Sequence, residues 1–375
     1  MKHKNLKSAI VFFLSFICLG FTQTATENAT KHSFIRGTRL FTGVHLEYWG
    51  YRETNSLETV LPIYYSMDLN NYVQGLSVDL VTSPMFGSLM SEKVTNNESV
   101  LGLSNTKARA SYNFNNLIIS SFGIQVPTGS NEQSLQQQNT VSALSTRNYH
   151  FRVSQIGSGL DLDFTVSSSY ELFDDFIVGF GAGFLTHGPF TPVEDGLEYN
   201  PGEEISAALG ADYLLMAGSR QIKFIGDAIF TYYTTDKLDD KDYYQSGFRL
   251  NLSISASTRL SPAYYNTLNL VLALRGDGKF ENGPSYQPGN ELLISDYVHF
   301  LKHKKFNPFV LARVFLFGEN EFEESSAQTF GLGGGGSLKL NNLISARAEL
   351  IIDAGLMDKD LVFGTEVNGG LNYDF

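Results

Sequence analysis

The chain ends on the fifteen residues Leu361 to Phe375, which read Leu-Val-Phe-Gly-Thr-Glu-Val-Asn-Gly-Gly-Leu-Asn-Tyr-Asp-Phe. Counted back from Phe375 in steps of two, one set of positions is apolar or neutral and the other is polar or glycine. Because successive side chains of a strand point to opposite faces, this pattern predicts an amphipathic β-strand. The segment exceeds the roughly 5 or 6 residues of a typical strand and covers the roughly 9 to 11 that cross a bilayer at a tilt. Its length therefore favours a membrane strand.

The same residues resemble the terminal strand of the outer-membrane β-barrels of Gram-negative bacteria. Proteins of that family commonly end on an aromatic residue, and their last strand carries a polar residue, a glycine and two large apolar residues at fixed spacing. Those places are filled here by Asn368, Gly370, Tyr373 and Phe375. The resemblance implies an outer-membrane location and recognition of this strand by the family's barrel-assembly machinery.

The composition is typical of a barrel. Charged residues make up 18% of the 375 residues, below the usual roughly 25%, while Tyr (19), Phe (29) and Gly (35) are abundant. The absence of a long apolar run excludes a bundle of membrane helices but not a barrel, whose polar lumen dilutes its apolar exterior. An acidic balance of 39 Asp and Glu against 27 Lys and Arg argues against nucleic-acid binding.

The N-terminus has the features of a secretory leader. Basic residues in positions 1–7 precede an apolar run at 9–21 that is too short to span a bilayer as a helix, and a polar stretch follows. We expect a signal peptide over 1–24, a short periplasmic segment over 25–37 and a barrel over 38–375. An N-terminal membrane anchor is the alternative. Cys18 lies within the expected leader, so the mature chain would have no cysteine.

Period-two segments closed by turns predict an all-β fold, a closed antiparallel transmembrane barrel of about sixteen strands, with fourteen as the alternative. Tight turns at Asn70-Asn71, Asn115-Asn116 and Asn341-Asn342 alternate with long stretches such as 83–105 and 127–157. The tight turns fall on the side of the C-terminus, as periplasmic turns do when both ends of an even-stranded barrel lie inside. A soluble β-sandwich is the competing fold.

The positions between the lipid-facing residues predict a charged lumen. Candidate lumen-lining residues that could select solutes are Glu47, Arg109, Asp161, Asp163, Arg249, Arg259, Arg275, Arg347 and Glu349. A ladder of arginines facing carboxylates can orient a passing solute, although the same charges can simply form a hydrated, ion-paired wall. The long stretches 83–105 and 127–157 are candidates to fold inward, and the polar tract 130–140 is either a short inward helix or an external loop.

A further resemblance links the chain to outer-membrane channels for fatty acids and aromatic hydrocarbons and to barrels found near phenol-degradation pathways. It depends on Tyr199-Asn-Pro-Gly-Glu-Glu204 at the start of a strand and on the strand order across 157–213. The resemblance implies hydrophobic solutes. An N-terminal plug of some tens of residues, present in the fatty-acid channels, does not fit, since the first strand is expected near Thr38.

We therefore expect a passive, porin-like channel for small solutes, hydrophobic compounds among them, in contact with outer-membrane lipid and lipopolysaccharide. The alternatives are a non-conducting barrel that displays its loops for adhesion or partner binding, and a barrel-embedded hydrolase. No Gly-x-Ser-x-Gly motif occurs, and the scattered histidines predict neither a catalytic nor a metal site. No cofactor is expected.

Overall fold

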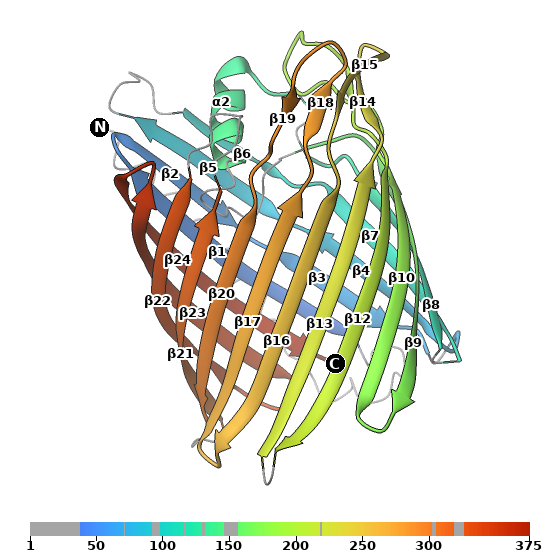
Figure 1. The fold of residues 1–375 in the computed structure, drawn as a ribbon, viewed down its shortest axis with the longest axis vertical. Coiled ribbons are helices and arrows are strands. Elements are labelled where there is room, and N and C mark those ends of the chain that lie inside the picture. Colours follow the sequence, from blue (N-terminus) through green and yellow to red (C-terminus); the bar gives the residue numbers. More distant parts are fainter. Residues whose placement is uncertain are drawn as a thin grey trace, which may run out of the picture.

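The protein is a barrel with a small cap at one end, as shown by a computed structural model (Figure 1). The structure describes residues 38–70, 72–91, 98–115, 117–129, 132–145, 157–217, 220–301, 305–318 and 326–375. One sheet holds nineteen strand segments. Three strands are each interrupted once, at residues 61–62, 83 and 104–105, so the nineteen segments form sixteen strands. The prediction of a sixteen-stranded barrel is confirmed, and the soluble sandwich and the fourteen-stranded barrel are excluded.

All neighbouring strands of the barrel run antiparallel. In chain order the barrel strands are β1 (Arg39–Tyr51), β2 (Thr54–Val60) continued by β3 (Ile63–Asp68), β4 (Leu76–Thr82) continued by β5 (Pro84–Ser91), β6 (Glu98–Leu103) continued by β7 (Thr106–Phe114), β8 (Ile118–Val126), β9 (Asp161–Phe173), β10 (Phe176–Thr186), β12 (Glu204–Ala217), β13 (Arg220–Tyr233), β16 (Arg249–Ser261), β17 (Tyr264–Arg275), β20 (Glu291–Phe300), β21 (Phe306–Phe317), β22 (Ala327–Lys339), β23 (Ile344–Met357) and β24 (Asp360–Asp374).

The terminal strand closes the barrel. β24 pairs with β1 over thirteen positions, from Arg39 opposite Asp374 to Tyr51 opposite Val362. The N–H of Phe375 also donates to the carbonyl of Thr38 at 2.9 Å. Closure leaves neither β1 nor β24 as a free edge, which is the condition for a sheet to sit in hydrocarbon. The barrel strands lie within the expected 38–375, and the expected leader (1–24) and periplasmic segment (25–37) lie outside the described residues.

Tight turns and longer connections lie at opposite ends of the barrel (Figure 1). Asn115 (φ 52°) and Asp175 (φ 68°) adopt left-handed conformations in the short turns, as short polar side chains can. The other end also holds two tight hairpins, at Arg52 and at Asp358-Lys359, so short and long connections do not alternate strictly. Arg52 joins these hairpins, since its Nε donates to Asp360 at 2.6 Å.

The expectation of a long polar loop over 83–105 is wrong for most of that stretch. β5 and β6 extend the two neighbouring strands through it, leaving only 92–97, which lie outside the described residues, between them. Pro84 lacks a backbone donor and interrupts the ladder at Ser83, and the small residues Gly87 and Ser88 dilute the apolar alternation. These features make a continued strand resemble a loop.

The long connections at the other end form a cap. A second sheet of five short strands is built from loop segments, namely β11 (Tyr199–Asn200), β14 (Thr235–Leu238), β15 (Lys241–Gln245), β18 (Gly278–Phe280) and β19 (Ser285–Tyr286). The connection after β8 contains the helix α2 (Leu135–Leu144). The polar tract at 130–140 is therefore partly helical.

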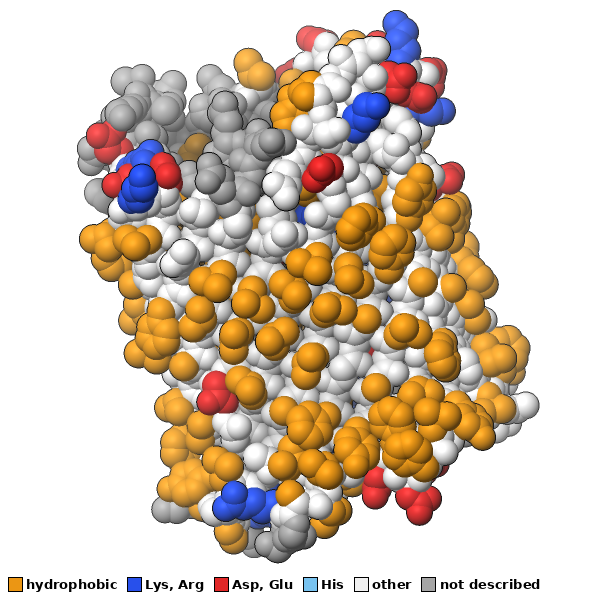
Figure 2. All heavy atoms as spheres, in the orientation of Figure 1, with side chains coloured by type: hydrophobic (Ala, Val, Ile, Leu, Met, Phe, Trp, Pro, Cys, Tyr) orange, Lys and Arg blue, Asp and Glu red, His pale blue; other side chains and the backbone are white. Residues whose placement is uncertain are grey.

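The outside of the barrel is apolar. Phe180, Leu209 and Ile254 face outward, and each is more than half exposed. Figure 2 shows such side chains over the whole height of the visible wall, with most charged groups at its two rims. Asn266 and Asp296 also face outward, and the Asn266 amide donates to the Asp296 carboxylate at 2.5 Å. An apolar belt with polar rims is the surface expected of a wall that faces lipid.

No helix among the described residues is both long enough and apolar enough to span a membrane.

The assignment of faces can be tested on β16. We expect Ile254→Lys to lower the free energy of unfolding by roughly 2–4 kcal/mol, because an outward lysine near mid-strand would enter hydrocarbon. The neighbouring Ser255 faces the lumen, so Ser255→Lys should cost far less. Urea unfolding in lipid vesicles measures both variants. Equal costs would contradict the assignment.

Candidate functional site in the barrel lumen

The register of the strands decides which side chains face the lumen. Residues directly opposite each other in antiparallel strands share a face, so one inward residue fixes a whole row around the barrel. The inward charged residues gather into two main groups, one on β21–β24 with β1 and β2, the other on β7–β10 with β12. In the strand order these groups lie about half a turn apart.

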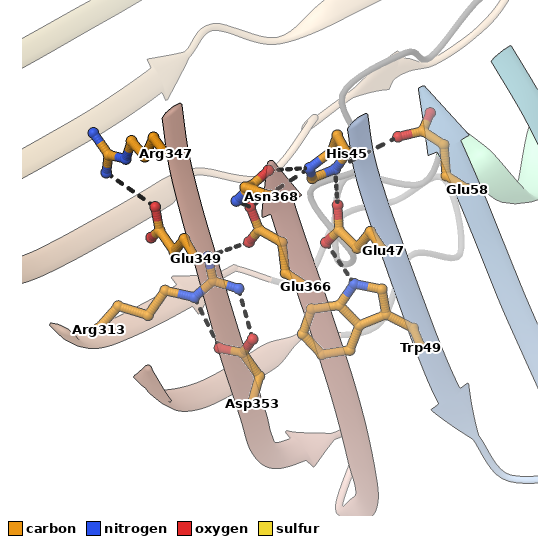
Figure 3. A network of polar contacts seen from close by, with 10 residues as sticks. All are labelled: His45, Glu47, Trp49, Glu58, Arg313, Arg347, Glu349, Asp353, Glu366 and Asn368. Atoms are coloured by element: carbon orange, nitrogen blue, oxygen red, sulfur yellow. Dashed lines mark hydrogen bonds and ion pairs between the residues drawn. The ribbon is translucent and has the colours of Figure 1, made fainter. Parts of the chain in front are cut away.

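The first group, here the seam cluster, comprises His45, Glu47, Glu58, Arg313, Asp353, Glu366 and Asn368 and spans the closure between β24 and β1 (Figure 3). Arg313 donates to Asp353 through Nε at 2.9 Å and through Nη2 at 2.6 Å, and its Nη1 donates to Glu366 at 2.7 Å. Paired donation by a planar guanidinium is the strong form of such a contact. The seam cluster thus ties β21, β23 and β24 together on the inner wall.

Two glycines make room for the seam cluster. Arg313, Gly331 and Asp353 lie in one row across β21, β22 and β23. A Cβ on Gly331 would lie 2.7 Å from Cγ of Arg313 and would also meet the Asp353 carboxylate. The ion pair therefore crosses β22 because its middle position has no side chain. Likewise, a Cβ on Gly364 would lie 2.8 Å from the ring of Trp49, whose indole N–H donates to Glu47 at 2.8 Å.

The second group, here the far-wall cluster, comprises Lys107, Arg109, Gln125, Asp161, Asp163 and His187. Asp163 accepts from Arg109 at 3.0 Å and lies 2.8 Å from the Lys107 ammonium. The Arg109–Asp163 pair also reaches across a strand at a glycine, because Arg109, Gly123 and Asp163 form one row over β7, β8 and β9. A Cβ on Gly123 would collide with the Asp163 carboxylate.

His187 anchors the outer end of the far-wall cluster, just beyond the end of β10. Its Nδ1 lies 3.0 Å from Asp161, and its Nε2 lies 3.6 Å from Glu204. Burial alone would lower the pKa of His187, but the two carboxylates outweigh burial and raise the pKa to about 9. The imidazolium is therefore present at neutral pH. A cavity of about 400 Å³ lies beside it, lined in part by Lys107, Asp163 and Glu204.

The other predicted lumen residues form smaller contacts. Arg347 donates to Glu349 at 3.0 Å. Arg249 lies directly opposite Arg275, which pairs with Glu291 at 2.8 Å. Arg259 differs from the others, because its guanidinium donates to the carbonyls of Ser261, the last residue of β16, and of Pro262, which follows it. It therefore lies at the rim of the barrel.

Of the predicted candidates, Arg109, Asp161 and Asp163 come together, and so do Arg347 and Glu349. Glu47 lies in the seam cluster with Asn368, which was predicted as an assembly residue. The seam cluster was not predicted as a unit because Arg313, Asp353 and Glu58 were not candidates. Arg313 lies between Ala312 and Val314 in an apolar run. Because that run lacks a clear polar and apolar alternation, the sequence does not show that Arg313 faces the lumen. An inward glycine between two charged strands is the signal that could have identified the pair.

The predicted assembly residues lie near the closure. Asn368 belongs to the seam cluster, and a Cβ on Gly370 would meet the ring of Phe41 on β1. The rings of Tyr373 and Phe375 lie 4.3 Å apart, and Phe375 is 41% exposed. The terminal aromatic pair is therefore outside any compact core.

The helix α2 lies against the inner wall. Val141 and Leu144 pack on Val60, Met85 and Val100, which share the inward face of β2, β5 and β6. A Cβ on Gly87 would collide with Leu144, so this glycine admits the helix. Of the two outcomes expected for the polar tract, the inward helix is the one observed.

A closed wall with an apolar exterior, a charged interior and an inward helix defines the architecture. The fold is that of an outer-membrane β-barrel. No model of a protein family matches the chain, and no curated protein matches it.

Solved structures with a similar fold include the CymD monoaromatic hydrocarbon channel, with 10% identity, a TM-score of 0.45 and coverage of 91% of this chain and 89% of that chain. OprB of Pseudomonas putida has 8% identity, a TM-score of 0.48 and coverage of 90% and 94%. An anion-selective porin from Comamonas acidovorans has 12% identity, a TM-score of 0.42 and coverage of 90% and 98%. Similarity at this level assigns no function to this chain.

The glycine rows can be tested by a matched pair of substitutions. We expect Gly331→Ala to lower the free energy of unfolding by about 1–3 kcal/mol, because the added methyl overpacks the Arg313–Asp353 pair. Gly179→Ala is the control, since Gly179 also faces the lumen and the nearest neighbour of its added Cβ would be 3.7 Å away. Urea unfolding of both variants measures the difference. A Gly331→Ala barrel as stable as the control would show that the pair does not need this glycine.

Proposed function

We propose that the protein is an outer-membrane channel through which small solutes pass passively. The observation that carries this proposal is the exposure of charged side chains on the inner wall, 38% for Arg109, 45% for Lys223 and 51% for Arg347. A barrel whose interior was filled by packed side chains would bury these groups. Sixteen strands enclose a lumen of the size that conducts in porins.

The lumen also presents aliphatic surface. Five inward residues of the wall from β8 to β17 are each about 40% exposed, namely Ile119, Ile177, Ile225, Ile229 and Val271. They stand between charged rows such as the Lys223–Asp212 pair, whose charged atoms are 2.8 Å apart. A solute with an apolar body and a charged group would find complementary surface for both. We therefore favour such amphipathic small molecules over purely hydrophobic ones.

The cap supports a second candidate, a barrel that binds a partner through its loops. The five-stranded cap sheet joins β11, β14, β15, β18 and β19 into one ordered surface. Tyr199 fixes it by donating to Asp236 at 2.5 Å, and the pKa of Tyr199 is raised by burial and by that carboxylate. Such a barrel would show no conductance and would lose partner binding when the cap is shortened.

The hydrolase alternative finds no support in an arrangement of serine, histidine and aspartate that lies among the described residues. Asp161 stands between Ser158 and His187, with its oxygens 3.5 Å from the serine Oγ and 3.0 Å from the histidine Nδ1. A nucleophilic serine needs the histidine, rather than the aspartate, as its direct neighbour. This arrangement therefore does not activate Ser158.

Single-channel recording in planar bilayers tests the proposal, and substitutions in α2 test whether this helix affects the conductance. Val141→Asp combined with Leu144→Asp places two carboxylates in the apolar contact on the inner wall, which should release the helix. If α2 narrows the lumen, the single-channel conductance of this variant is higher than that of the wild type. Leu135→Asp is the control, because Leu135 is 72% exposed and should leave conductance unchanged. A folded wild-type barrel that never conducts would refute the channel.

A further inference from the structure

We infer that the inner wall beside the barrel closure holds a binding site for a divalent transition-metal ion, built from His45, Glu47 and Glu58. One ligand atom from each of these three residues can be chosen so that all lie within 4.8 Å of one another. All three side chains are buried, with at most 2% exposure. This site goes beyond the proposed channel and does not depend on it.

The ligands come from adjacent strands whose register brings them together. Glu47 on β1 lies directly opposite Glu58 on β2 and directly opposite Glu366 on β24. Ionised carboxylates side by side on neighbouring strands repel one another, and a cation next to the row lowers that repulsion. Arg313 supplies one such cation at Glu366 and Asp353 (Figure 3).

The orientation of His45 points its second ring nitrogen at the two other ligands. The amide nitrogen of Asn368 donates to Glu366 at 2.7 Å, which turns the amide oxygen of Asn368 toward His45. That oxygen lies 2.7 Å from Nδ1 of His45, which must then carry a proton and donate it. Nε2 faces Glu47 at 3.1 Å and Glu58 at 4.0 Å. A nitrogen that faces two carboxyl groups must bear a proton, accept a hydrogen bond from a protonated carboxyl group, or share a cation with them.

This arrangement is the one by which proteins hold metal-binding histidines. A ligating imidazole commonly donates its other N–H to a carbonyl or carboxylate group that fixes the ring. The Trp49 indole likewise holds Glu47, by donating to its second oxygen at 2.8 Å. Asn368 and Trp49 would thus act as positioning residues for two of the three ligands.

The distances suit a first-row ion such as Zn²⁺. Bonds of about 2.0–2.1 Å in a tetrahedral site place neighbouring ligand atoms about 3.3 Å apart. Nε2 of His45 lies 3.1 Å from Glu47, close to that spacing, and 4.0 Å from Glu58, which must therefore move closer to bind the ion. One imidazole and two carboxylates form a ligand set that zinc uses, and the two anionic ligands would balance the charge of the ion.

An adjoining cavity, which reaches His45 and Glu47 but not Glu58, provides room for a water ligand. Its volume is about 240 Å³, and its lining includes His45, Glu47, Arg313 and Glu366. An ion bound here would join β1 to β2 directly and to β24 through Asn368. It would therefore strengthen the barrel at its closure.

Calorimetric titration of the detergent-solubilised, chelator-treated full-length barrel with Zn²⁺ tests the site. We expect one saturable ion per chain, with affinity at least about tenfold weaker in His45→Gln and in Glu58→Gln. Zinc should also raise the resistance of the wild type, but not of Glu58→Gln, to unfolding by urea. His299→Gln is the control, because this lumen histidine contacts the rings of Tyr265, Tyr297 and Phe309.

The mobility of unheated samples in gels shows whether each variant is folded. If His45→Gln does not fold, the comparison of Glu58→Gln with the wild type still tests the site. The visible spectrum of bound Co²⁺ provides a second readout of a low-coordinate site with a nitrogen ligand. No saturable binding to the folded wild type up to about 1 mM Zn²⁺ would overturn the proposal and leave His45 as a protonated partner of the carboxylates. Binding that Glu58→Gln leaves unchanged would place the ion elsewhere and also overturn it.

Discussion

The pairing of the first strand with the last is the constraint on which the rest of the structure depends. A sheet edge in hydrocarbon would expose backbone groups that no water can satisfy, each at a cost of several kcal/mol. β1 and β24 remove that cost over thirteen paired positions. Once the wall is closed, every strand has one face toward lipid and one toward the lumen, so a single register fixes the environment of each side chain.

The lumen is organised by small residues as much as by charged ones. Two strong ion pairs, Arg109 with Asp163 and Arg313 with Asp353, each reach over a strand whose central position is glycine. The same device admits Trp49 above Gly364 and α2 above Gly87. Glycine is costly within a strand, because it loses more entropy and packs nothing. Its repeated use on the inner wall indicates that cross-strand contacts there outweigh that cost.

The sequence predicted the barrel well because period-two alternation is a local signal. The predicted turn at Asn341-Asn342 lies between β22 and β23, and the terminal strand was assigned from its own fifteen residues. The prediction failed where tertiary context decides. The stretch at 83–105 reads as a loop because Pro84 and Gly87 interrupt its pattern, whereas neighbouring strands hold it in the sheet.

The candidate site was harder to predict than the fold, because its members meet only through register. Glu47 and Glu58 are eleven positions apart in sequence, yet they lie directly opposite each other across one hairpin. Arg313 reaches Glu366 from three strands away, a contact that no spacing in the sequence reveals. Alternation identifies which face a charge occupies. The offset between strands, which decides its neighbours, is set by turns and bulges that the sequence specifies only weakly.

Single-cysteine scanning along β16 is the most direct test of a wall with one lipid face and one wet face. Cys18, the chain's one cysteine, is replaced, and each position from Leu250 to Leu260 is changed to cysteine in turn in vesicle-embedded protein. The account predicts that a charged, water-soluble thiol reagent modifies the inward set, Asn251, Ser253, Ser255, Ser257 and Arg259, while a lipid-soluble quencher reaches labels at the positions between them. Accessibility without a period of two along this strand would contradict it.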